Sequence, residues 1–78
     1  MKVMITAVNE VFFDGVADSV SVPAANGMLT ILPMHMPLIT PLKKGTITVR
    51  EKGGIAPKEF PVNSGVMEVC RDGATIIL

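Results

Sequence analysis

Apolar and polar residues alternate with a period of two along most of this chain, and no segment repeats with the period of an amphipathic helix. Such alternation is typical of β-strands. Residues 16–23 show it most clearly, with two sets of side chains: Val16, Val20 and Val22 on one face, and Ala17, Ser19 and Ser21 on the other. Asp18 shares the valine face, so we expect it at the rim of a sheet, where water reaches it.

Turn residues divide the alternating segments into short predicted strands. An Asp14-Gly15 pair is a strong turn signal and predicts a reversal between the second and third of them. The expected strands cover residues 2–8, 11–14, 16–23, 28–32, 38–42, 46–51, 59–63, 66–70 and 74–78. Short strands at intervals of roughly 8 to 12 residues are the pattern of a β-sandwich. We therefore predict an all-β fold in one domain, residues 1–78, and exclude a doubly wound α/β fold.

Composition limits the classes of function. The chain is 78 residues long, with seven acidic and seven basic residues and no run of like charge, which argues against a nucleic-acid surface. The longest apolar window, residues 28–42, is too short to span a bilayer and contains three prolines. Hydrophobic residues make up 49% of the chain and six are methionine, so we expect an exposed apolar patch, which is typical of an interface.

Candidate chemistry is sparse. His35 is the only histidine and Cys70 the only cysteine, so the sequence offers neither a metal-ligand cluster nor a disulfide. No nucleophile-elbow pattern surrounds the serines, and the glycines form no phosphate-binding motif. We therefore expect no enzyme activity, no metal, no nucleotide site and no cofactor.

Residues 27–40 are the most distinctive stretch. His35 lies between Met34 and Met36, and Pro33 and Pro37 bracket all three. Two interpretations stay open. The histidine can be a loop residue that bonds a neighbouring backbone group, or the stretch can be a docking tip, stiffened by its prolines, whose methionines adapt to a partner surface.

Several motifs resemble the amino-terminal domain of the F-type ATP synthase epsilon subunit. Part of the resemblance is carried by four segments outside residues 26–40: Phe13-Asp14-Gly15, Asp18-Ser19-Val20-Ser21-Val22-Pro23, Lys44-Gly45-Thr46-Ile47 and Asn63-Ser64-Gly65-Val66-Met67-Glu68-Val69. The most specific part is the spacing of seven residues: Gly27, Leu29, Pro33, His35, Pro37, Leu38 and Thr40. The similarity covers nearly the whole chain.

This resemblance implies a flattened two-sheet β-sandwich of short antiparallel strands. It implies a non-catalytic rotor subunit of the central stalk, which links the gamma subunit to the membrane c-ring of a proton- or sodium-translocating synthase. The contact with the polar loops of the c-ring would use Met28, Met34, His35 and Met36. Thr40 and Leu42 would lie toward gamma. The chain would then be peripheral, reaching the membrane only through the c-ring, on the cytoplasmic face of an energy-coupling membrane such as the bacterial inner membrane.

Two features depart from the family pattern. The family often has an acid where Met28 stands and small residues where Met34 and Met36 stand, so contact here would rely on burial instead of charge. Members usually continue into a two-helix carboxy-terminal hairpin, which is associated with inhibition of ATP hydrolysis and in some members with ATP binding. The sequence given stops at Leu78, so we expect neither property from these residues.

Two alternatives come from other functional classes. The triplet at 34–36 resembles the Met-Lys-Met turn of biotinyl or lipoyl carrier domains, but His35 stands where the modified lysine would be. A free-standing protein-binding β-sandwich adaptor is the other alternative.

Overall fold

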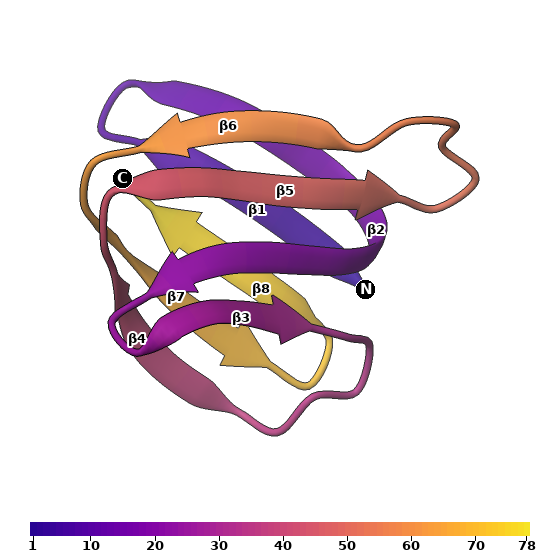
Figure 1. The fold of residues 1–78 in the computed structure, drawn as a ribbon. Helices are drawn as coiled ribbons and strands as arrows, with labels where there is room; N and C mark the ends of the chain where they lie inside the picture. Colours follow the sequence, from indigo (N-terminus) through magenta and orange to yellow (C-terminus); the bar gives the residue numbers. More distant parts are fainter.

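A computed structural model describes all residues from Met1 to Leu78, and it contains strands and turns only. It contains no helix that is long and apolar enough to cross a membrane. The strands, labelled in Figure 1, are β1 (Lys2–Ala7), β2 (Glu10–Ala24), β3 (Gly27–Ile31), β4 (Leu38–Leu42), β5 (Gly45–Glu51), β6 (Lys58–Val62), β7 (Gly65–Cys70) and β8 (Gly73–Ile77).

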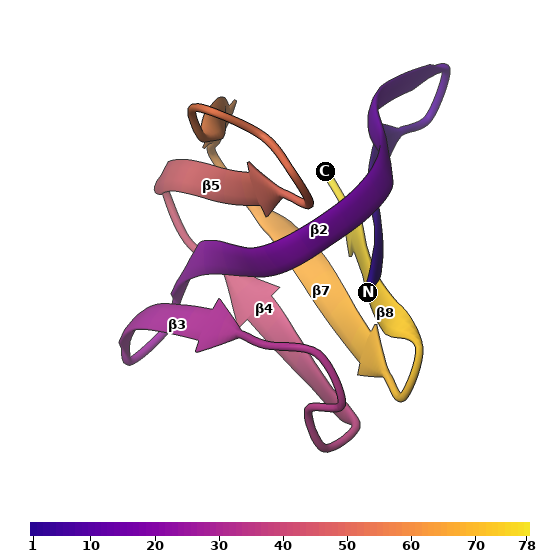
Figure 2. The same cartoon turned by 90° about the vertical axis from the view of Figure 1, so that its right-hand side faces the viewer.

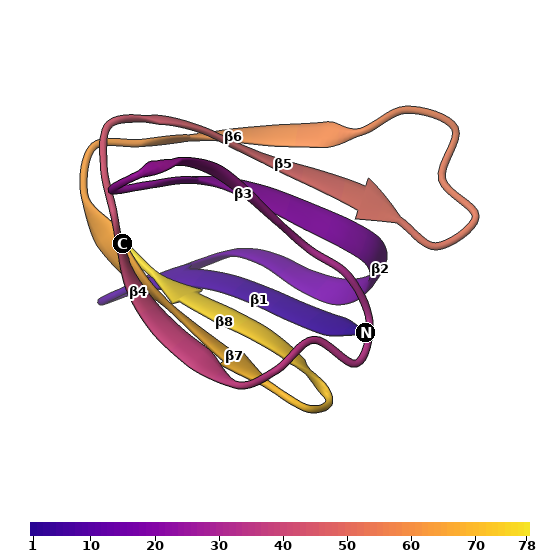
Figure 3. The same ribbon diagram turned by 60° about the horizontal axis from the view of Figure 1, so that its bottom comes forward.

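The strands form two packed layers, which Figure 3 shows one above the other. One layer contains β1, β8, β7 and β4, and the other contains β3, β5 and β6. The long β2 belongs to both, because its first half pairs with β1 and its second half with β3 and β5. The predicted all-β sandwich is confirmed.

The predicted turn at Asp14-Gly15 is wrong. Both residues lie inside β2, where Asp14 pairs with Met4 and Gly15 with Val3. The glycine has a packing reason instead: a Cβ on Gly15 would lie 3.1 Å from the ring of Phe13. Gly15 therefore makes room for a core aromatic ring within a continuous strand.

The side-chain alternation of β2 changes within the strand. The register shifts between Ala17 and Ser19, as at a β-bulge. Ala17 and Val20 are both buried, whereas Val16 is 49% exposed, so the predicted facing of Val16 and Ala17 is wrong. One extra residue in a bulge moves every earlier side chain to the other face. Asp18 is exposed at this bulge, as expected.

One strand pair departs from the antiparallel pattern. β1 and β8 run parallel, from Lys2 opposite Gly73 to Thr6 opposite Ile77. Gly73 is needed at this approach, because a Cβ there would overlap the carbonyl oxygen of Lys2. All other strand pairs are antiparallel.

The space between the layers is filled by aliphatic side chains, and no polar or charged side chain is buried. Phe13 and Phe60 meet edge to face across it, with ring centroids 5.9 Å apart. The largest fully buried residues come from both layers: Ile5, Ile31, Ile47, Met67 and Ile76. Because the interior is apolar throughout, docking or chemistry has to use the surface.

Candidate docking surface

The connection between β3 and β4 carries the histidine and two of the methionines. It crosses from one layer to the other at the lower end of the molecule in Figure 2. It begins with a tight turn in which the backbone N–H of His35 donates to the carbonyl oxygen of Leu32 at 3.2 Å. Pro33 and Met34 are the two central residues, and Met34 has a φ of +67°. A proline followed by a residue with positive φ is the pattern of a type II turn. We call residues 32–36 the tip.

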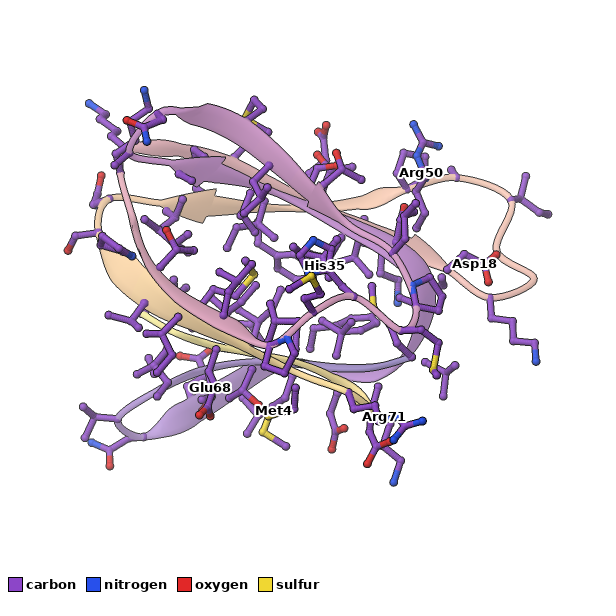
Figure 4. All side chains as sticks on the ribbon, turned by 90° about the horizontal axis from the view of Figure 1, so that it is seen from below. Met4, Asp18, His35, Arg50, Glu68 and Arg71 are labelled. Carbon is purple, nitrogen blue, oxygen red and sulfur yellow. The ribbon has the colours of Figure 1, made fainter.

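His35 does not project from the tip. Its imidazole Nδ1 donates to the carbonyl oxygen of Met36 at 2.8 Å, and the residue is half-buried. Seen from below, the labelled side chain lies over the space between the two layers (Figure 4). The interpretation of a loop histidine bonded to a neighbouring backbone group is therefore confirmed. The imidazole also fixes the backbone that follows Met34.

The apolar residues of the tip point outward. Leu32 is 57% exposed, Met34 69% and Met36 78%. None of them belongs to the core cluster or packs against it. The exposed apolar patch predicted from composition is therefore present here, on a short loop held by a backbone hydrogen bond and a histidine side chain.

Met28 is exposed as well, but it lies apart from the tip. It stands near the start of β3, beside the β2–β3 turn, whereas the tip follows the end of β3 (Figure 1). A strand of five residues spans about 17 Å. Met28, Thr30 and Leu32 alternate with less exposed residues and line the outer side of β3, which joins Met28 to the tip. We call these three residues the β3 ridge.

This part of the chain carries no ionised side chain. No Asp, Glu, Lys or Arg occurs between Asp18 and Lys43. The single ion pair of the structure, Lys58 to Glu51 at 3.1 Å, lies on β5 and β6 instead. The β3 ridge and the tip themselves therefore contribute burial of apolar surface and hydrogen bonds to a contact, and any ion pair has to come from neighbouring strands, where Glu68 lies close to Pro37.

The two residues predicted to lie toward gamma differ from one another. Thr40 is half-buried, and its hydroxyl donates to the carbonyl oxygen of Pro41 at 3.3 Å. It lines a shallow hollow with Gly27, Met28 and Leu29. Leu42 is only 5% exposed and belongs to the core. Leu42 is therefore corrected from a contact residue to a packing residue.

The outer face of β4 is a surface that the sequence prediction missed. Ile39 is 71% exposed, and Pro41 stands beside Val66 of β7, which in turn stands beside Ile77 of β8. Val66 and Ile77 are 44% and 55% exposed. Strict alternation along residues 38–42 places Leu42 inside and Ile39 outside, so the signal was present in the sequence. Apolar residues at both positions concealed it.

Comparison with known proteins places this chain in a family. The family model for the ATP synthase delta/epsilon chain β-sandwich domain matches residues 1–78. The ATP synthase epsilon chain of Gloeobacter violaceus is 38% identical over 77 residues, covering 99% of this chain and 57% of the relative. Epsilon chain 2 of Burkholderia orbicola is also 38% identical and is covered over 51% of its length. The chain spans about half the length of the curated relatives it matches.

Solved structures share the fold. A chain of the Euglena gracilis mitochondrial ATP synthase, from a structure described as OSCP/F1/c-ring, superposes with a TM-score of 0.84 at 18% identity, over 96% of this chain and 48% of that one. A chain of the Tetrahymena thermophila mitochondrial ATP synthase, described as central stalk/c-ring, gives 0.78 at 18% identity, over 99% and 61%. The family match from the first residue to the last confirms the resemblance found in the sequence, and the chain belongs to the β-sandwich domains of the ATP synthase delta/epsilon chains.

Proposed function

We propose that this domain is a non-catalytic part of the rotor of an F-type ATP synthase, where it links the gamma subunit to the c-ring. One observation carries the proposal: a chain that matches the epsilon family along its whole length presents an uncharged, apolar and conformationally fixed tip. The solved complexes that contain chains of the same fold include a c-ring and, in the Tetrahymena thermophila complex, the central stalk, which supports these partners.

The proposed c-ring contact comprises the tip and the β3 ridge. Met34 and Met36 supply exposed thioether side chains, and Met28 extends the contact along β3. His35 takes part through its backbone and through the bond that fixes Met36. Burial of two methionine side chains contributes about 3 to 5 kcal/mol, from which the entropy of association must be subtracted.

The proposed gamma contact uses β4. Thr40 remains a candidate because it is half-buried at the rim of a hollow and retains an accessible edge. Ile39 takes the place of Leu42, since its side chain is 71% exposed on the outer face of the same strand. Val66 and Ile77 add exposed apolar side chains on β7 and β8, and the exposed Glu68 stands opposite Ile39 on the same face.

The same proposal gives the domain a peripheral position at a membrane, held there by its protein partners. We place it on the cytoplasmic face of a bacterial inner membrane, because relatives at 38% identity come from bacteria. Whether the coupling ion is a proton or sodium has no bearing on this arrangement, since the domain itself transports nothing.

Co-purification tests the docking role. A double variant, His35→Glu with Met36→Glu, should lose c-ring association, because a carboxylate buried in an apolar contact without a partner is strongly unfavourable. Binding to purified gamma should persist, and the circular dichroism spectrum should remain that of a folded β protein. Val8→Glu is the matched control, since Val8 is 93% exposed on the β1–β2 turn, far from the tip (Figures 1 and 2). Unchanged c-ring association in the double variant would refute the docking role.

A further inference from the structure

We propose that Met34 is the specificity-determining residue of the tip, and that its side chain enters an apolar, uncharged recess on the partner. The inference rests on the proposed function and adds to it which residue decides the fit and what chemistry the partner recess has. Met34 has a positive φ, a backbone conformation that glycine would adopt more easily than methionine.

Met34 is the only residue other than glycine with a positive φ, at +67°. It occupies the third position of the turn closed by His35 N–H and Leu32 C=O. A type II turn needs positive φ at this position, and glycine meets that need without steric cost. Any residue with a Cβ is disfavoured there, because the Cβ crowds the following carbonyl oxygen.

The Met34 side chain makes no core contact that would offset this strain. The Met34 side chain is 69% exposed and takes no part in the core cluster or in its partly buried surroundings. The hydrogen bond that closes the turn uses backbone atoms of Leu32 and His35, so a glycine at position 34 would keep it. Strained positions of this kind are found where the side chain has a function outside the fold. The methionine therefore serves a contact beyond this chain.

The surroundings of Met34 define the chemistry of that contact. Its exposed neighbours Leu32 and Met36 are apolar, and the His35 imidazole is turned away and bonded to Met36. No ionised side chain occurs between Asp18 and Lys43. A charged group that contacts Met34 would lose its hydration without gaining a counter-ion from the tip itself. The recess that fits this tip is therefore apolar and uncharged.

The local structure also makes Met34 a suitable anchor. Pro33 fixes the backbone dihedral before it, and the bond from His35 Nδ1 to Met36 fixes the backbone after it. The flexible thioether side chain then adapts to the shape of a recess while its point of attachment stays in place. Anchors whose backbone is already ordered lose less entropy on binding.

Three variants separate the side chain from the backbone conformation. Met34→Gly removes both the side chain and the strain, Met34→Ala removes the side chain and keeps the strain, and Met34→Leu keeps an apolar side chain with the strain. We would measure the thermal midpoint of each chain and its affinity for the detergent-solubilised c-ring of the same synthase, at 50 and 500 mM salt. Val8→Ala is the control for loss of an exposed apolar side chain elsewhere.

Met34→Gly should raise the thermal midpoint by about 4 °C or more and weaken binding about tenfold. Met34→Ala should weaken binding as much while leaving the midpoint near that of the parent chain. Met34→Leu should bind within about threefold of the parent, because a swap of leucine for methionine nearly conserves volume. Affinity should change by less than about threefold between the two salt concentrations, since no charge pair is screened.

Each contrary result has a distinct meaning. If Met34→Gly binds as tightly as the parent while the His35→Glu, Met36→Glu variant does not bind, the docking role stands and the role of Met34 is refuted. If neither change affects binding, the docking role fails. A fall in affinity of more than about tenfold at high salt would refute an uncharged recess. Binding of the parent chain to zwitterionic lipid vesicles, lost in Met34→Gly, would assign the recess to lipid instead of protein and overturn the proposal.

Discussion

Two turns in this protein are built in the same way and filled differently. In the β3–β4 connection, His35 N–H donates to Leu32 C=O, and Met34 has a φ of +67°. In the β5–β6 hairpin, Gly54 N–H donates to Glu51 C=O at 3.0 Å, and Gly53 has a φ of +74°. Both turns place a residue with positive φ directly before the donor. One has the glycine that this geometry favours, and the other has a methionine.

The residues around the two turns also differ, because one turn is flanked by charged side chains and the other by apolar ones. The β5–β6 turn is flanked by ionised residues, and the Lys58–Glu51 ion pair closes its base. Ile55 in the same loop is fully exposed, but it stands alone among glycine, alanine and proline. The β3–β4 turn has no ionised residue near it in sequence and carries three exposed apolar side chains. The comparison supports the proposal that the β3–β4 turn is a contact surface and that the β5–β6 turn only connects strands.

The largest effect should come from charge placed on each loop. The double variant His35→Glu, Met36→Glu should weaken c-ring association at least about a hundredfold, because two carboxylates would lose hydration in an apolar contact. The equivalent pair in the other loop, Ile55→Glu with Ala56→Glu, should leave association within about twofold. Association is measured by co-purification with quantification of the bound chain. Equal loss from both pairs would end the distinction between the loops.

A large effect on stability should come from the two sides of β4. Leu42→Ala should lower the free energy of unfolding by about 2 to 5 kcal/mol, because it leaves a cavity in the core. Ile39→Ala removes an exposed side chain and should lower it by less than about 0.5 kcal/mol. Urea denaturation of both variants checks this difference. In binding experiments the order should reverse, with Ile39→Ala weakening the association with gamma. Comparable unfolding free energies would contradict the assignment of Leu42 to the core.

A smaller effect on stability should follow from a substitution at Gly53, the residue with positive φ in the β5–β6 loop. Gly53→Met should lower the free energy of unfolding by about 1 to 2 kcal/mol, since it introduces the strain that Met34 already carries. Space is not the obstacle, because no atom lies within 4 Å of a Cβ built there. The thermal midpoint should fall while c-ring binding stays unchanged. A midpoint equal to that of the parent would show that the φ value carries no strain at either turn.

The smallest effect should come from the ion pair at the base of the β5–β6 loop. The Lys58 and Glu51 side chains are 56% and 32% exposed, so solvent screens their attraction. Lys58→Met should lower the free energy of unfolding by less than about 1 kcal/mol and should not alter binding. Thermal unfolding at low and high salt measures this. A loss that persists at high salt would point instead to the Lys58 contact over the Phe13 ring, 5.6 Å from its centroid.

Local sequence signals predicted most strands, because half-buried strands impose the alternation that the sequence shows. Local signals failed where contacts between distant parts of the chain determine the strand bounds or the strand pairing. Gly15 reads as a turn residue but accommodates the Phe13 ring inside β2. The parallel pairing of β1 with β8 joins the two ends of the chain, and no local pattern encodes it.

The docking surface was predicted in its character and less well in its geometry. The exposure of the methionines is confirmed, whereas the stiffening by the prolines stays a prediction. Met28 was grouped with Met34 because the family resemblance implied one shared contact, and the length of β3 separates the two residues. Leu42 was assigned to the gamma contact from the family resemblance, and hydropathy did not correct this because β4 is apolar on both faces. The positive φ of Met34 had one signal, Pro33 directly before it.

A titration of two variants against the c-ring tests whether the tip is a contact surface and the β5–β6 loop is not. Met34→Gly and Gly53→Met make the two turns alike from opposite directions, and each is titrated against the c-ring with its thermal midpoint recorded. We predict that Met34→Gly binds about tenfold more weakly with a higher midpoint, and that Gly53→Met binds like the parent with a lower midpoint. Parent-like binding by Met34→Gly together with weakened binding by Gly53→Met would contradict the account.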